Sequence, residues 1–147
     1  MRVSTLLMFS VFGLSCAGLL FAADSEKELK KFEGTWTLSS GEADGKPLTE
    51  KQLKGGKLVI KGDHYTVTIP DKDKMTGTQK VDPAKTPKAI DISDDSGPNK
   101  GKTSLGIYEF KGEEFHCVFS APGKDRPAKF STAADSGQWL HVWKKSK

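Results

Sequence analysis

Three histidines are the side chains that could hold a metal ion. His64, His116 and His141 fall in three separate stretches in which apolar and polar residues alternate, so each is expected on a different strand. Imidazole nitrogens are common zinc ligands, and distant strands can meet in a closed sheet. Strand register decides the face on which each imidazole lies, and the spacing alone does not supply it. We therefore predict no metal site and no cofactor.

Two loops match nucleotide- and calcium-binding motifs only in part. Residues 97–103 read GPNKGKT, but a P-loop has four residues between its glycines and leads into a helix. Here three residues separate the glycines, and the residues that follow have the alternation of a strand. Residues 71–77 read DKDKMTG, in which Met75 occupies a ligand position and no glutamate closes the loop. Both loops are predicted to be solvated turns.

The thiol of Cys117 is the remaining candidate for catalysis. It alternates with Phe115 and Phe119, which places it on an apolar strand face. A reactive thiolate needs an accessible, electropositive setting, so a buried and inert thiol is expected. The chain also lacks a Ser-His-Asp spacing and a nucleophile elbow. We predict no catalytic residue and a protein that is not an enzyme.

The first 23 residues have the pattern of a secretory signal peptide. Arg2 gives a positive start, residues 6–21 are almost continuously apolar, and Ala22-Ala23 precedes a charged run. The predicted organisation is a signal peptide at 1–23 and one domain at 24–147, located in the periplasm or outside the cell. The alternatives are a buried helix or a membrane anchor. A membrane anchor usually needs about 20 apolar residues, and this run is shorter. No stable membrane span is therefore expected after cleavage.

Cys16 suggests a second alternative, a lipid-anchored protein. The preceding residues are Gly13-Leu14-Ser15 rather than a leucine and two small residues, and the apolar run continues to Phe21. Both departures argue against lipidation. Cleavage would leave Cys117 as the single cysteine, so no internal disulfide is expected.

The formal net charge of +4 favours no particular partner. Arg126 is the one arginine outside the predicted signal peptide, and the remaining positive charge comes from scattered lysines. Nucleic-acid sites more often combine arginine with interleaved aromatic residues. We expect no nucleic-acid partner.

After a charged segment at Ser25–Lys31, predicted to make one or two helical turns, the chain divides into short alternating segments. Eight strands are predicted, at Thr35–Ser40, Lys57–Lys61, His64–Ile69, Met75–Val81, Ala89–Ser93, Thr103–Phe110, Glu114–Ser120 and Gln138–Lys144. Turn signals about 8–12 residues apart indicate an antiparallel sandwich or barrel. The alternation of one polar and one apolar face favours the closed barrel. The predicted fold class is therefore all-β.

The first strand and several later motifs resemble a known family. Gly34 and Trp36 match the Gly-x-Trp with which the calycin superfamily, the lipocalins and fatty-acid-binding proteins, begins its first strand. An ordered set of motifs follows: DGKPL at 44–48, LVIKGD at 58–63, KTPKAIDI at 85–92, GPNKGKT at 97–103 and APGK at 121–124. Together they resemble an uncharacterised lipocalin-like domain family expanded in planctomycete bacteria.

The resemblance implies an eight-stranded, calycin-type barrel and export. It also implies that Trp36 closes one end of the barrel beneath a basic residue of the last strand, Lys144 or Lys145. Fatty-acid-binding proteins hold a carboxylate with Arg-x-Tyr on the last strand, where this chain has His141 and Trp143. The family has no established activity, so the resemblance does not predict a reaction or a specific ligand.

The alternation predicts an apolar inner face that could bind a ligand. Its candidate binding residues are Tyr65, Val67, Ile69, Ile90, Ile92, Leu105, Ile107, Phe115 and Phe119, and Leu140 and Val142 are placed on the same face. Such a face can be a filled core or a cavity wall, because a barrel of this size is just wide enough for either. We predict an exported protein that binds a small apolar or amphipathic ligand. The alternative is a solid barrel whose loops, 94–102 and 121–137, contact another envelope protein.

Overall fold

The computed structural model describes residues 17–147. Most of the predicted signal peptide, including Cys16, lies outside the described residues. The helices are α1 (Ala17–Phe32) and α2 (Glu50–Leu53). The strands are β1 (Gly34–Ala43), β2 (Lys46–Pro47), β3 (Lys57–Lys61), β4 (His64–Thr68), β5 (Met75–Asp82), β6 (Ala89–Asp94), β7 (Thr103–Lys111), β8 (Glu114–Phe119) and β9 (Trp139–Lys145).

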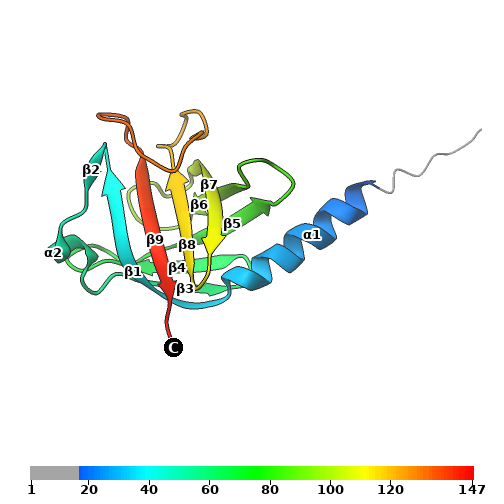
Figure 1. Ribbon diagram of the computed structural model, residues 1–147, viewed down its shortest axis with the longest axis horizontal. Coiled ribbons are helices and arrows are strands. Elements are labelled where there is room, and N and C mark those ends of the chain that lie inside the picture. Colours follow the sequence, from blue (N-terminus) through cyan, green and yellow to red (C-terminus); the bar gives the residue numbers. More distant parts are fainter. Residues whose placement is uncertain (1–16) are drawn as a thin grey trace, which may run out of the picture.

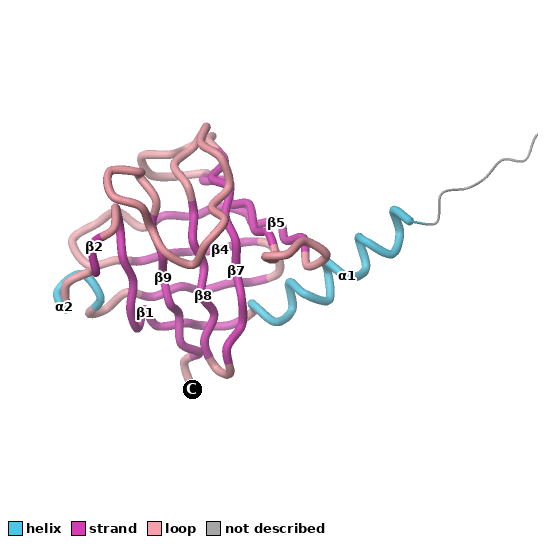
Figure 2. The backbone as a smooth tube through the Cα atoms, turned by 45° about the horizontal axis from the view of Figure 1, so that its top comes forward, coloured by secondary structure: helices cyan, strands magenta, loops and turns pink. Residues whose placement is uncertain are grey.

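The strands form a closed antiparallel barrel, as predicted. Each of β3 to β9 pairs with its neighbour in the chain, and β1 pairs with both β3 and β9. The barrel therefore consists of eight strands, with β2 as a short addition at the end of β1 (Figures 1 and 2). The architecture is all-β and lipocalin-like, with a helix before the first strand.

The C-terminal end of α1 closes one end of the barrel with an aromatic cluster. Phe32 is completely buried, and its ring lies 5.0 Å from Tyr108, 4.8 Å from Phe110 and 5.3 Å from Phe115 between centroids. Trp36 packs edge-on against Phe115 at 4.7 Å. The predicted helical segment thus lies within a longer helix that serves as the plug of the barrel.

Trp36 has the role expected of it, but the cation above it comes from Lys145. The Lys145 ammonium lies 4.5 Å from the indole centroid, and the indole Nε1 donates to the Phe32 carbonyl at 2.7 Å. Lys144 pairs with the exposed Thr37 and points away from the interior, so its prediction as the cation is wrong. Gly34, at φ +123°, leaves room for the lysine, because a Cβ there would lie 3.1 Å from Lys145 Nζ.

A buried carboxylate fastens α1 to the barrel. The Glu28 side chain accepts hydrogen bonds from Lys88 Nζ at 2.8 Å and the Tyr108 hydroxyl at 3.0 Å, and it pairs with Lys31 at 2.6 Å. Burial alone would raise the pKa of Glu28, but the hydrogen bonds from Lys31, Lys88 and Tyr108 outweigh it and lower that pKa. The Ser25 hydroxyl adds a bond to the Val81 carbonyl at 3.1 Å.

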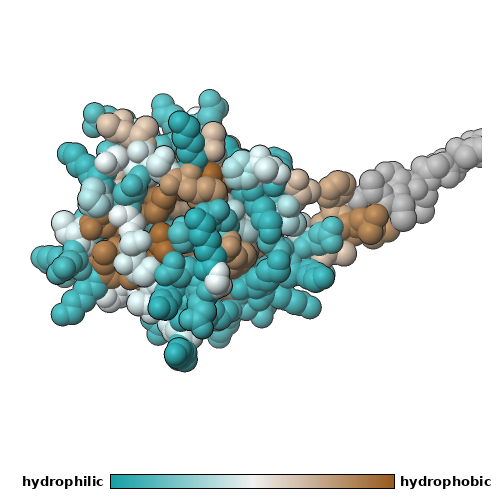
Figure 3. Space-filling view, in the orientation of Figure 1, coloured by the Kyte–Doolittle hydropathy of each residue, from teal (hydrophilic) through white to brown (hydrophobic). Residues whose placement is uncertain are grey.

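The start of α1 stands away from the barrel. Leu19, Leu20 and Phe21 are 73%, 67% and 59% exposed, and they form an apolar surface beside the barrel in Figure 3. None of the helices within residues 17–147 has the length and apolar character needed to cross a membrane.

The face assigned to β7 from the sequence is wrong. In the ladder, Ile90 pairs with Gly106 and Phe119 pairs with the same glycine, so Gly106 lies on the inner face. Leu105 and Ile107 therefore point outward. Gly106 is needed beneath Phe119, because a Cβ there would come within 2.5 Å of the phenyl ring.

The same correction applies to β9. Trp139, His141 and Trp143 face inward, opposite Phe119, Cys117 and Phe115, whereas Leu140 and Val142 face outward. On the outer side, Arg126 fastens the connection between β8 and β9 to the barrel. Its guanidinium donates to Asp91 Oδ1 at 2.6 Å and to the Gly106 carbonyl at 2.7 Å.

Candidate ligand-binding cavity

The barrel encloses a cavity of about 1090 Å³. Its wall is formed by inward side chains of the strands, among them Leu38, Leu58, Ile90, Phe115 and Trp143. Its rim is formed at the end opposite the aromatic plug, by α2, the turn between β4 and β5, and the connection between β6 and β7. The sequence did not decide whether the inner face is a filled core or the wall of a cavity, and the structure shows a cavity.

Seven of the nine predicted binding residues line this cavity. They are Tyr65, Val67, Ile69, Ile90, Ile92, Phe115 and Phe119. Leu105 and Ile107 do not, because the register of β7 turns them outward. Gln79 and the aromatic side chains of β9 also line the cavity and were not among the predicted residues. The spacing of Trp139, His141 and Trp143 shows that they share one face of β9, but Leu140 and Val142 make the other face apolar too, so the alternation did not show which face is inner.

The side chain of Tyr65 passes over Gly77 and reaches the rim of the cavity. Gly77 lies opposite Tyr65 on β5, and a Cβ at this glycine would overlap the tyrosine hydroxyl. The hydroxyl donates to the carboxylate of Asp94 at the end of β6. Burial and the adjacent Asp94 carboxylate raise the pKa of Tyr65, so the phenol stays protonated.

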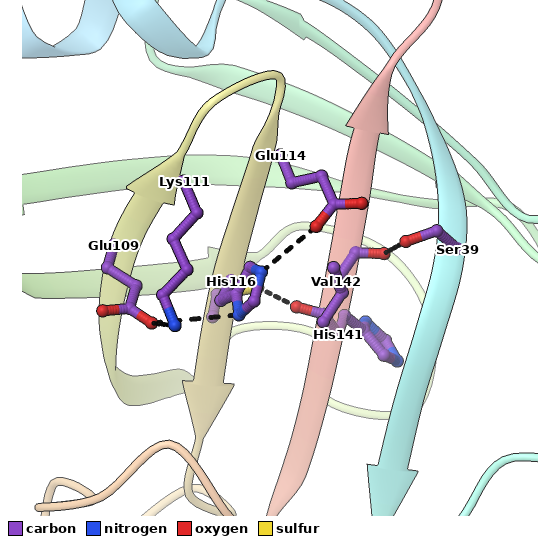
Figure 4. A network of polar contacts seen from close by, with 8 residues as sticks. Ser39, Glu109, Lys111, Glu114, His116, His141 and Val142 are labelled. Carbon is purple, nitrogen blue, oxygen red and sulfur yellow. Dashed lines mark hydrogen bonds and ion pairs between the residues drawn. The ribbon is translucent and has the colours of Figure 1, made fainter.

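Only His141 of the three histidines faces the cavity. His64 is exposed at the start of β4. His116 lies on the outer surface, with Nδ1 3.8 Å from Glu109 and Nε2 3.4 Å from Glu114 (Figure 4). Within residues 17–147, no three histidine, cysteine, aspartate or glutamate side chains are grouped so as to hold a metal ion.

The titratable groups in the middle of the wall are uncharged at neutral pH. Burial, together with the positive charge of Lys72, lowers the pKa of His141 to about 4. Burial raises the pKa of the Cys117 thiol to about 12, and its Sγ lies 3.7 Å from the His141 carbonyl oxygen. The thiol is thus buried, as predicted, and carries little thiolate.

Gln79 is an unusual member of the wall because its amide has no partner. Its side chain is 4% exposed and points inward from β5, opposite Ile92. Among the described residues, its Nε2 is a buried nitrogen that makes no hydrogen bond. Buried polar groups are usually paired, so an exception in a cavity wall calls for a functional explanation.

Charged residues gather at the rim of the cavity. They are Lys51, Asp71, Lys72, Asp73 and Asp94, which come from α2, the β4–β5 turn and the end of β6. Lys51 and Asp71 lie 4.0 Å apart with both side chains largely in solvent. With two lysines and three aspartates, the opposite charges of the rim nearly cancel, so its net charge gives little selection between anions and cations.

His141 should make the stability of the protein depend on pH. Its folded-state pKa of about 4 lies below its ordinary value of 6.5. Between these pH values the unfolded chain binds a proton at His141 that the folded chain does not. The stability contributed by the neutral imidazole is therefore fully present above pH 6.5 and is lost as the pH falls. We expect the wild type to lose about 2 kcal/mol relative to His141→Gln between pH 7 and pH 4.5, measured by urea unfolding. His64→Gln is the matched control, and an equal effect of both variants would contradict the assignment.

No family model, curated protein or solved structure matches this chain.

Proposed function

We propose that this protein is an exported, non-enzymatic, lipocalin-like barrel that binds a small apolar or amphipathic molecule in its cavity. The observation that carries the proposal is the cavity of about 1090 Å³, lined largely by aliphatic and aromatic side chains. Ligand pockets in proteins commonly measure about 300–1,000 Å³ and have such walls. The cavity argues against the alternative of a solid barrel, and contact of the loops with an envelope protein stays a prediction.

Two further features support the proposal. A thiol with a pKa of about 12 is a poor nucleophile and an imidazole with a pKa of about 4 is a weak base, which favours binding over catalysis. The signal-peptide pattern of residues 1–23 supports export. The contacts that fasten α1 to the barrel begin at Ser25 and Glu28, so cleavage near Ala23 would leave them in the mature chain.

Binding can be tested with the purified protein and a lipid extract. Native mass spectrometry should find a bound species, and the tryptophan emission should shift on binding because Trp139 and Trp143 line the cavity. The absence of any bound species together with an unchanged emission would contradict the proposal.

A charge placed on the cavity wall should weaken binding. Val67 lines the cavity on β4, whereas Val59 on β3 pairs with Thr35 and Thr66 and lies outside the cavity lining. An apolar ligand would strip water from a carboxylate at position 67, which is costly. We expect Val67→Glu to weaken the binding of an apolar fluorescent probe at least ~10-fold at pH 8, equivalent to about 1.4 kcal/mol. Val59→Glu is the matched control and should bind as the wild type does.

A further inference from the structure

One residue on the inner face of β5 differs from its neighbours in having a polar side chain. Met75, Gly77 and Val81 share the inward face with Gln79, and among these only Gln79 brings a hydrogen-bonding side chain. Leaving its buried amide unpaired costs stability in the empty barrel, and an apolar residue of the same size would avoid that cost. The amide is therefore expected to find its partner in an occupant of the cavity.

The surroundings of Gln79 favour an uncharged partner. The other polar groups in the middle of the wall, the His141 imidazole and the Cys117 thiol, are both neutral at pH 7. The charged residues of the lining belong to α2, to the β4–β5 turn and to the end of β6 at the rim. A carboxylate or ammonium group brought to Gln79 would lose its water without gaining a counter-charge, which is unfavourable.

We propose that Gln79 binds the head group of a neutral amphipathic ligand through a hydroxyl or carbonyl oxygen. The amide N–H donates to that oxygen, and the amide oxygen can in turn accept from a hydroxyl. The apolar part of the ligand packs against wall residues such as Leu58, Ile90 and Phe119. This inference rests on the proposed function, because it requires that the cavity be a binding site.

The test compares ligands of one chain length that differ in their head group. The probe is diphenylhexatriene, a fluorescent hydrocarbon with no hydrogen-bonding group, and the competitors are 1-dodecanol, 2-dodecanone and dodecanoate at pH 8. For the wild type we expect dodecanol and dodecanone to displace the probe at concentrations at least ~10-fold lower than dodecanoate requires.

The variant Gln79→Leu isolates the amide while keeping an apolar side chain of similar size. It should bind diphenylhexatriene as the wild type does and lose about 10-fold in affinity for dodecanol, the expected effect of one hydrogen bond. Val59→Leu, a change on β3 outside the cavity lining that does not alter polarity, should keep the wild-type selectivity. Binding of the hydrocarbon probe also shows that each variant is folded.

The outcomes separate the two proposals. If the hydrocarbon binds but Gln79→Leu leaves the affinity for dodecanol unchanged, or dodecanoate binds as tightly as dodecanol, the head-group assignment is overturned while the cavity remains a binding site. If neither the hydrocarbon nor any competitor binds the wild type, both the assignment and the proposed function are overturned.

Discussion

Replacing Trp36 with alanine should lower the free energy of unfolding by about 3–5 kcal/mol, the usual cost of deleting a buried large aromatic side chain. The indole is 3% exposed and packs against Phe115 at the closed end of the barrel. Its removal also leaves the Phe32 carbonyl without its donor and the Lys145 ammonium without the aromatic face beneath it. All three losses act on the same end of the barrel.

The measurement is urea unfolding followed by circular dichroism at neutral pH. Trp139→Ala is the matched control, because that indole is only partly buried and stacks on Phe119 beside the cavity. We expect the control to cost about 1–2 kcal/mol, since a side chain at the cavity wall loses fewer contacts. A Trp36→Ala protein within 1 kcal/mol of the wild type would contradict the role of Trp36 in closing the barrel.

Replacing Glu28 with alanine should cost about 2–4 kcal/mol. The change removes the acceptor of the buried Tyr108 hydroxyl and the partner of Lys88, and it leaves the hydroxyl unsatisfied at the base of the barrel. Breaking a buried ion pair by removing one member is strongly destabilising because the remaining polar groups stay desolvated. Lys88 is partly exposed and can return to water, which keeps the expected cost below the upper limit for such pairs.

The contribution of Glu28 should also depend on pH. Its folded-state pKa is lowered, so the stability it adds is present above its ordinary pKa of 4.5 and is lost as the pH falls through the folded value. The difference in unfolding free energy between the wild type and Glu28→Gln should therefore be largest at neutral pH and shrink below pH 4.5. Glu26→Ala, a change of an exposed carboxylate on the same helix, is the control and should have little effect at either pH. A difference that grows on acidification would refute the lowered pKa.

Much of the barrel could be predicted because its strands are short and are separated by clear turns. All eight predicted strands have counterparts in the closed sheet, and Gly34 and Trp36 correctly marked the end at which it closes. The helix was predicted too short. Its contacts through Ser25 and Glu28 join α1 to distant strands, and such tertiary contacts are absent from a local helical pattern.

The faces of β7 and β9 could not be predicted for a physical reason. Alternation separates two faces of a strand, but both faces of these strands carry apolar side chains: Ile107 and Val142 are buried on the outer side, while Tyr108 and Trp143 are buried within. The choice depends on cross-strand partners, such as Phe119 over Gly106, that no local pattern reveals. The hollow interior likewise depends on how completely the side chains fill the space, which alternation does not specify.

The pairing of the first strand with the last has a consequence for the order of folding. Trp36 on β1 pairs with Lys145 on β9, so the barrel closes between residues that are far apart in the chain. Forming contacts between residues so far apart in the chain has the largest entropic cost of loop closure, and it slows folding. A chain that is still emerging cannot complete this pairing until β9 is available. The topology therefore keeps the barrel open until β9 is present, so the closed cavity forms only when the whole domain is available.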